Sequence, residues 1–236
     1  MTGYAGMAIA PLRILLVCLA AMPLCGAAMA GVSDQAAKIQ QVTEVVSAVS
    51  GMPESIPASL LKKAQAIAII PAVIKVGLVV GGRYGQGVIL VRRPDDSWSG
   101  PAFLSITGGS VGWQIGAQST DVILVFGSAA GVTGLVDGKF TLGADASVAA
   151  GPVGREASAA TDVTLDAEIY SYSRSRGLFA GVALEGAQLK IEHDDNALYY
   201  HRENITPQQI FQDQAPLPQS ARALARLLER HAGSGQ

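Results

Sequence analysis

Residues Gly143–Glu192 contain the most informative pattern of the chain, and their centre reads Ala167-Glu-Ile-Tyr-Ser-Tyr-Ser-Arg-Ser-Arg-Gly-Leu-Phe-Ala-Gly-Val-Ala-Leu184. Between Glu168 and Tyr172 the residues alternate between two sides of the chain, which is the period-2 pattern of a strand. A polar break follows over Ser173–Gly177, and an apolar run resumes over Leu178–Leu184. The succession of strand, turn and strand predicts a β-hairpin.

Short extended segments recur along the chain from Gly77 onward. Their expected ranges are 78–80, 87–92, 102–106, 111–117, 122–126, 139–142, 147–150, 166–173, 178–184 and 188–192. Many short strands at near-regular spacing favour an antiparallel sheet that curls toward a barrel, because curling also hides the edge strands. A short helix is expected over Ser128–Val136. The predicted fold class is therefore α+β: mainly antiparallel β, a curled barrel-like sheet with helices at the N- and C-terminal ends.

Two helices are expected before the sheet. Residues Gly31–Ser50 repeat apolar side chains at three- and four-residue steps, and a glycine–proline break follows. A second helix begins after Glu54, gives way around Ala66 to an extended apolar run, and stops at Pro71. The apolar run over 64–80 is too interrupted for a transmembrane helix, so its predicted place is the core.

The C-terminal end is expected to be helical again. Thr206 is predicted to cap a helix that has proline at its first position, and a stiff linker follows over Ala215–Pro218. Ser220 is predicted to cap the last helix, whose leucines share one face. The opposite face carries three arginines, Arg222, Arg226 and Arg230. Such a helix can lie on an anionic surface, but docking on its own domain is favoured.

A set of short motifs follows in order along the chain. These motifs are Ala68-Ile-Ile-Pro71, Gly81-Gly82, Trp98-Ser-Gly-Pro-Ala102, Gln114-Ile-Gly-Ala117, Ala149-Ala-Gly-Pro-Val-Gly154, Tyr170-Ser-Tyr-Ser-Arg-Ser-Arg-Gly-Leu-Phe-Ala-Gly181 and Leu184-Glu-Gly186. In this order and spacing they resemble the signatures of the SYLF lipid-binding domain family. The expected organisation is a signal peptide over 1–30, an N-terminal helix over 31–53, a SYLF-like domain over 54–212, and a linker with an amphipathic helix over 213–236.

The resemblance implies a binding function without catalysis. SYLF domains bind acidic phospholipids, notably phosphoinositides, and basic residues and an amphipathic helix in the N-terminal part of the domain are implicated. The lipid-binding residues expected here are Leu60, Leu61, Lys62, Lys63, Lys75 and Arg83. A bacterial anionic lipid is an equal alternative to a phosphoinositide. The competing function is a structural or protein-interaction module of the cell envelope, with a protein partner.

The charge of the chain is small overall but unevenly distributed. A formal net charge of −2 excludes a polycation, so nucleic acid is not expected as a partner. The segment Ser55–Arg93 nevertheless holds six basic residues and no acidic one. Such a segment forms either a positive patch or a solvated face that lacks acids, and the sequence leaves both open.

The first thirty residues resemble an export signal. Arg13 precedes the apolar run Ile14–Ala21, and Ala28-Met29-Ala30 is a small-x-small cleavage site. The expected location is periplasmic, outer-membrane-associated or secreted. Cys25 raises the alternative of a lipoprotein, although Met22-Pro23-Leu24 fits a lipobox poorly. Both cysteines of the chain lie in this segment, so a mature chain has no disulfide and no cysteine-ligated zinc.

No residue pattern predicts catalysis. Gly108-Gly-Ser110-Val-Gly112 matches a nucleophile elbow, but an elbow requires strand, turn and helix, and the residues after Ser110 alternate like a strand. Glu168 and Glu185 are expected to face each other across the hairpin, without a fixed catalytic separation. His193-Asp194-Asp195 is predicted to be a turn rather than a cation site. We therefore expect neither an enzyme nor a bound cofactor or metal.

The export signal makes a direct prediction about the native chain. If the small-x-small site is cleaved, mass spectrometry of the native protein will give a chain that starts at Gly31. A chain that starts at a diacylated Cys25 would contradict this prediction and establish the lipoprotein alternative.

Overall fold

The computed structural model describes residues 25–52, 55–77, 80–111, 116–153, 167–175, 177–212 and 217–233. The helices are α1 (Cys25–Ser50), α2 (Ala58–Lys63), α3 (Ala129–Val136), α5 (His193–Tyr200), α6 (Pro207–Gln212) and α7 (Gln219–Gly233). The strands are β1 (Ala66–Gly77), β2 (Val80–Val91), β3 (Ala102–Val111), β4 (Gly116–Phe126), β5 (Phe140–Thr141), β6 (Val148–Ala150), β7 (Ile169–Ser175), β8 (Leu178–Gly181) and β9 (Gln188–Ile191).

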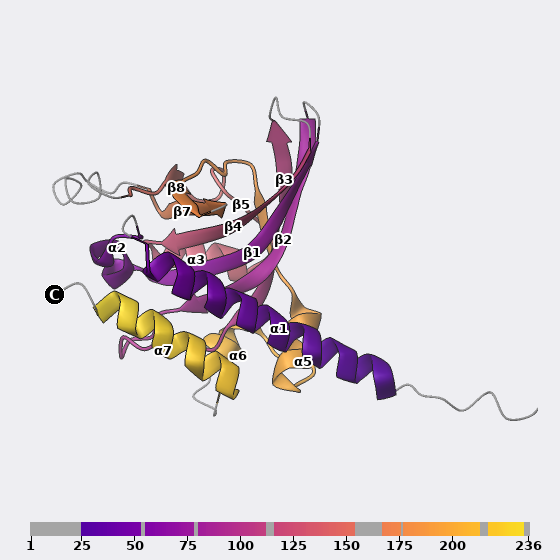
Figure 1. Cartoon of the computed structure of the whole chain (residues 1–236). Helices are drawn as coiled ribbons and strands as arrows, with labels where there is room; N and C mark the ends of the chain where they lie inside the picture. Colours follow the sequence, from indigo (N-terminus) through magenta and orange to yellow (C-terminus); the bar gives the residue numbers. More distant parts are fainter. Residues whose placement is uncertain are drawn as a thin grey trace, which may run out of the picture.

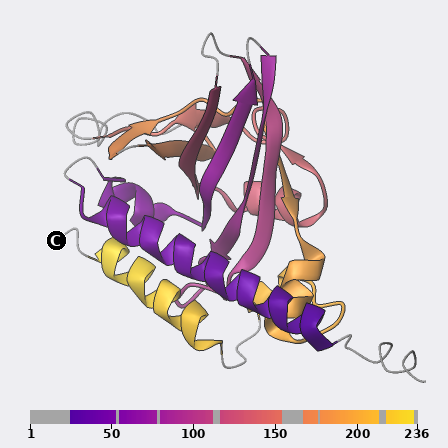
Figure 2. The ribbon, with the colours of Figure 1, turned by 45° about the vertical axis from the view of Figure 1, so that its right-hand side comes forward.

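One curled sheet forms the centre of the molecule (Figure 1). Its strand order is β5-β9-β3-β2-β1-β4-β7-β6, and β8 pairs with β7. The described pairs are antiparallel except for β6 with β7. Helices lie at both chain ends, as Figure 2 shows for α1 and α7, which run side by side across one face of the sheet. The predicted fold class is confirmed.

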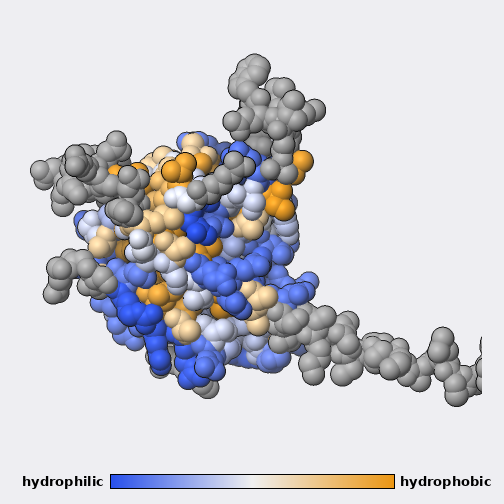
Figure 3. All heavy atoms as spheres, viewed as in Figure 1, coloured by the Kyte–Doolittle hydropathy of each residue, from blue (hydrophilic) through white to orange (hydrophobic). Residues whose placement is uncertain are grey.

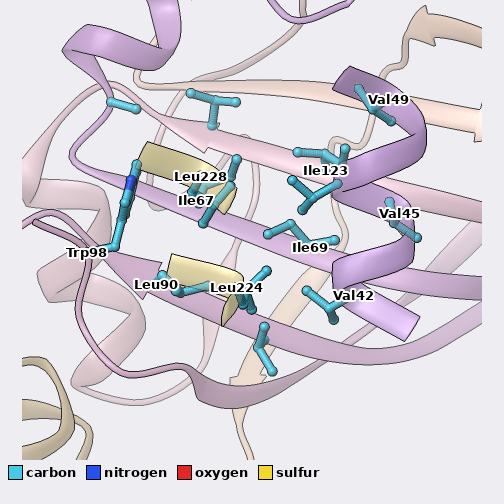
Figure 4. Packing of buried hydrophobic residues seen from close by; sticks show 14 of the residues in the cluster. Val42, Val45, Val49, Ile67, Ile69, Leu90, Trp98, Ile123, Leu224 and Leu228 are labelled. Atoms are coloured by element: carbon cyan, nitrogen blue, oxygen red, sulfur yellow. The ribbon is translucent and has the colours of Figure 1, made fainter. Parts of the chain in front are cut away.

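The face of the sheet under α1 and α7 forms the first of two cores (Figure 4). On α1 the buried side chains recur at the predicted helical spacing, and they pack against alternate residues of β1 and β2 such as Ile69 and Leu90. Leu224 and Leu228 of α7 enter the same core. The prediction that the last helix docks on its own domain is therefore confirmed, and α1 docks beside it.

The opposite face of the same strands forms the second core. There the alternate residues of β1, such as Ala68 and Ile70, meet apolar side chains of α3, β5 and the segment before α6. The predicted short helix over 128–136 is confirmed as α3, and the Ser128 hydroxyl accepts a hydrogen bond from the Gly131 amide at its start. Because both faces are covered, the first half of β1 is apolar at every position.

The predicted stop at Pro71 is wrong, because β1 continues through it to Gly77. The pairing of β1 with β4 shifts register between Ile70 and Val73, so Pro71 lies in a β-bulge. A bulge tolerates proline because the missing N–H is not needed in the ladder. The separate strands expected at 78–80 and 87–92 are likewise one strand, β2, over its described length; residues 78 and 79 lie outside the described residues.

Glycines of β2 make room for this bulge. A side chain at Gly87 would place its Cβ 2.1 Å from the Ile69 carbonyl oxygen, and one at Gly85 would meet the side chain of Val73 at 2.7 Å. The bulge also holds Ala72 at a φ of 51°, a left-handed conformation that is costly for a non-glycine residue. The Ala72 amide donates a hydrogen bond to the Asp121 carboxylate at 3.0 Å.

The predicted hairpin is confirmed as β7 and β8. Tyr172 stacks on Phe179 with a centroid separation of 5.2 Å, and its ring fills the space over Gly151, where a Cβ would lie 2.0 Å from the ring. Tyr170 and Tyr172 both belong to the first core. Pairing with β8 ends at Gly181, earlier than the expected end of the strand at Leu184.

Two local predictions at the C-terminal end need correction. His193 begins helix α5, so the predicted turn at 193–195 is wrong. The last helix begins at Gln219, and Ser220 lies inside it, where its hydroxyl forms a 2.8 Å hydrogen bond with the Tyr199 hydroxyl instead of capping. The Thr206 cap is confirmed, because its hydroxyl accepts from the Gln209 amide at 3.3 Å.

The close approach at Gly87 can be tested by a single methyl group. Gly87→Ala is expected to lower the free energy of unfolding by about 2 kcal/mol or more, because the added Cβ would overlap backbone atoms of β1. Gly82→Ala, on the same strand with no atom within 4 Å of its Cβ, is the matched control and should change it by less than about 0.5 kcal/mol. Equal effects in urea denaturation would contradict this account of the bulge.

Candidate functional site

Lys62 and Lys63 lie at the C-terminal end of α2, and both side chains are exposed. Neither ammonium group has a hydrogen bond or an ion pair with any residue that the structure describes. Leu60, by contrast, is only 3% exposed and belongs to the core under α7, and Leu61 packs partly against it. The structure thus presents the lysines of the predicted helix to solvent and turns its leucines inward.

Arg92 holds the end of α2 in place. Its Nε donates to the Ala64 carbonyl at 2.9 Å and one Nη to the Leu61 carbonyl at 2.7 Å, which satisfies carbonyl groups at the helix C-terminus. The guanidinium also stacks over the Trp98 ring, with Cζ 4.5 Å from the centroid. Arg93 similarly donates to the carbonyls of Trp98 and Phe211. These two arginines of the basic segment are structural.

The turn after Arg92 and Arg93 places two aspartates, Asp95 and Asp96, near the end of α2. Asp96 accepts a hydrogen bond from Arg92 through its backbone carbonyl, and the Asp95 carboxylate accepts from the amide and hydroxyl of Ser97. Those hydrogen bonds lower the pKa of Asp95. The surface around α2 is consequently basic on the helix itself and acidic on the adjacent turn.

Lys75 and Arg83 lie far along the sheet from α2. They are directly opposite each other in the β1–β2 ladder. From Ala66, next to α2, to Lys75 an extended strand covers roughly 30 Å. The structure therefore separates the predicted lipid-binding residues into two groups, one on α2 and one on the outer half of β1 and β2.

Lys75 and Arg83, the group on β1 and β2, are partly buried positive charges. Burial lowers the pKa of Lys75, with a further contribution from the Arg83 charge, and burial also lowers the pKa of Arg83. The Arg83 Nε and one Nη are buried and have no hydrogen-bond partner among the described residues. A guanidinium with unpaired buried donors is costly, and a bound anion would supply the missing acceptors.

Three large apolar side chains are exposed on the other face of the same strands. Ile74 is 48% exposed, Val76 58% and Tyr84 51%. Ile74 pairs directly with Tyr84, so these side chains are neighbours. We name Ile74–Val76 of β1 and Arg83–Tyr84 of β2 the strand tip. Figure 3 shows hydrophobic surface where these strands emerge from the body of the molecule.

Sequence reasoning missed the apolar face of the strand tip. It assigned the whole apolar run over 64–80 to the core, and that assignment is wrong for Ile74 and Val76. No signal in the sequence marks this face, because the shift of register at Pro71, which changes which residues point to which face, is visible only once β1 is paired with β4.

The remaining candidate residues do not form a catalytic group. Ser110 lies within strand β3 rather than at a strand-to-helix turn. Glu168 accepts hydrogen bonds from Ser128 and Ser147, and the β7–β8 pairing stops before it could bring Glu185 opposite. Among the described residues, no set of His, Cys, Asp and Glu side chains is arranged to hold a metal ion. A separate finding is that no helix in this part of the chain is both long and apolar enough to span a membrane.

The outer face of α7 carries its three arginines away from the core. Arg222, Arg226 and Arg230 are exposed, while the opposite side of the helix is buried. Because α7 contacts both α1 and α2, these arginines and the lysines of α2 belong to the same helical layer.

Comparison with known proteins decides the family. The family model described as "Ysc84: Las17-binding protein actin regulator" matches residues 107–231. The chain belongs to the Ysc84, or SYLF, domain family. It is 35% identical over 203 residues to Protein YSC84 of Saccharomyces cerevisiae, which covers 85% of this chain and 43% of that protein.

Animal relatives give the same result. SH3 domain-containing YSC84-like protein 1 is 33% identical over 198 residues in Xenopus laevis, covering 84% of this chain and 59% of that protein. The Homo sapiens protein of that name is 35% identical over 210 residues, covering 86% of this chain and 60% of its own length. The SYLF chain described here thus spans between about two fifths and three fifths of these relatives.

The placement of Ser110 inside a strand predicts that it is not a nucleophile. A fluorophosphonate probe should leave the protein unlabelled, because a strand residue lacks the strained turn that exposes and activates an elbow serine. Labelling that disappears in Ser110→Ala, with the thermal midpoint unchanged, would contradict the prediction and indicate a serine hydrolase.

Proposed function

We propose that this SYLF domain binds anionic phospholipid surfaces reversibly and without catalysis. The observation that carries the proposal is the lack of partners for its basic side chains. Among the described residues, Lys62 and Lys63 are exposed without a partner, and the buried Nε and one Nη of Arg83 have no acceptor. Cations that are not neutralised by the protein are free to meet phosphate groups. Membership of the SYLF family supports the same function.

The physical scale of such binding is modest. Each basic residue near an anionic surface contributes about 1 kcal/mol, and the contribution decays within a Debye length. A small number of cations therefore gives binding that is reversible and weakened by salt. The proposed ligands are bacterial acidic phospholipids or phosphoinositides, which share the phosphate chemistry, and the proposed place of action is the cell envelope after export.

A second candidate function is protein binding. The family description names Las17 binding, and a relative in Saccharomyces cerevisiae is named LAS seventeen-binding protein 3. In that case the same cations would face an acidic protein partner. Vesicle binding that falls at high salt and requires anionic lipid supports the lipid function, whereas indifference to lipid composition supports the protein function.

The α2 lysines provide the sharpest test of the lipid function. Lys62→Glu with Lys63→Glu should weaken sedimentation with phosphatidylglycerol vesicles by more than about tenfold, because two attractive charges become repulsive. The thermal midpoint should barely change, since exposed lysines contribute little to stability.

A matched control reverses equal charge elsewhere. Lys139 and Lys190 are exposed and lie outside α2, so Lys139→Glu with Lys190→Glu should weaken vesicle binding much less. If the α2 variant binds as the control does, then α2 is not the membrane contact. If it unfolds, the two lysines have a structural role.

A further inference from the structure

The helices that the structure describes leave the strand tip uncovered. On the face that carries Ile69 and Leu90, α1 and α7 cover the first half of β1 and β2. Beyond the bulge the same face carries Ile74, Val76 and Tyr84, and Figures 1 and 2 show the long strands rising past the helical layer. A contiguous group of exposed apolar side chains on a monomer marks an interaction surface.

The reverse face of the strand tip has the opposite chemistry. Lys75 and Arg83 alternate with the apolar residues and therefore point to the other side of the strands. Over the described lengths of β1, β2, β3 and β4 the sole carboxylate is Asp121, and it is neutralised by a 2.6 Å ion pair with Arg174. No acid of these strands is left to repel an anionic ligand.

The chemistry of the two faces together indicates which kind of partner binds the strand tip. A protein that docked on the apolar face would leave Lys75 and the unpaired donors of Arg83 unsatisfied on the other side. The interfacial layer of an anionic bilayer surrounds an inserted edge and offers both environments at once, with acyl chains for apolar side chains and phosphates for cations. Tyrosine is also a preferred residue at that depth.

We propose that the strand tip inserts edge-on into the interface of an anionic phospholipid bilayer, with Ile74, Val76 and Tyr84 in the acyl boundary and Lys75 and Arg83 on headgroup phosphates. The inference rests on the proposed lipid-binding function and adds to it the element that enters the membrane. It also assigns the unpaired Arg83 donors a ligand.

A fluorescent dye attached at one position of the strand tip measures its insertion into the bilayer directly. In a full chain with Cys18→Ser and Cys25→Ser, a single cysteine at Val76→Cys carries an environment-sensitive nitrobenzoxadiazole dye. On mixing with phosphatidylglycerol vesicles its emission should shift to the blue and be quenched by brominated acyl chains. The control is Leu178→Cys, because Leu178 is 77% exposed on β8, outside the tip, and should show neither change.

Two sets of variants then measure the contributions of the apolar face and the basic face of the strand tip separately. Ile74→Thr, Val76→Thr and Tyr84→Thr together should lower the affinity for these vesicles by roughly tenfold or more, whereas Leu178→Thr should leave it unchanged. Threonine suits an exposed strand, so the thermal midpoint should be retained. Lys75→Gln with Arg83→Gln should lower affinity about tenfold, and more than the charge-matched Arg222→Gln with Arg226→Gln.

The outcomes distinguish the inference from the function on which it rests. If the unchanged chain does not bind anionic vesicles, both are overturned. If it binds and the tip variants bind equally well, with the Val76 dye unaltered, lipid binding stands and the insertion of the strand tip is overturned. If the dye is already blue-shifted without vesicles and the shift grows with protein concentration, a second copy of the chain covers this face, which also overturns the inference.

Discussion

The bend in β1 at Pro71 and Ala72 is the constraint on which the arrangement of this molecule depends. Ala72 keeps its left-handed conformation because its amide donates a hydrogen bond to the Asp121 carboxylate. Arg174 of the neighbouring strand β7 donates to the same carboxylate and holds it in place. The chain can bend there only because Gly87 presents no side chain to it. Residues far apart in sequence thus cooperate at one point of the central strand.

This bend gives the two halves of β1 different surroundings. Before it, both faces of the strand are buried between the helical layer and the second core. After Val73, the strand leaves the body of the protein, and the exposed apolar side chains of Ile74 and Val76 alternate with the partly buried Lys75. Transfer of the exposed Ile74 side chain out of water is favourable, so a surface that removes it from water is the natural complement of this half.

The sequence predicted what depends on local chemistry. The hairpin of β7 and β8, the helix at Ser128 and the Thr206 cap follow from residues next to one another, and all were found. The roles of Arg92 and Arg93 could not be predicted, because their acceptors include carbonyls far away in sequence, such as that of Phe211. Proline similarly predicted an end at 71, since a bulge is visible only once β4 is paired.

The distribution of basic residues shows why a charge run in sequence is weak evidence for a patch. The acid-free segment divides in space into arginines that bind carbonyls, lysines on α2, and the Lys75–Arg83 pair of the tip. The α2 lysines belong to the helical layer, which lies on the same side of the sheet as Ile74 and Tyr84. A bilayer that received the tip edge-on and tilted toward that side would approach α2, whereas the Lys75–Arg83 pair would meet headgroups from the opposite side. The α2 lysines and the Lys75–Arg83 pair would then contact the same membrane, each from its own side of the inserted strands.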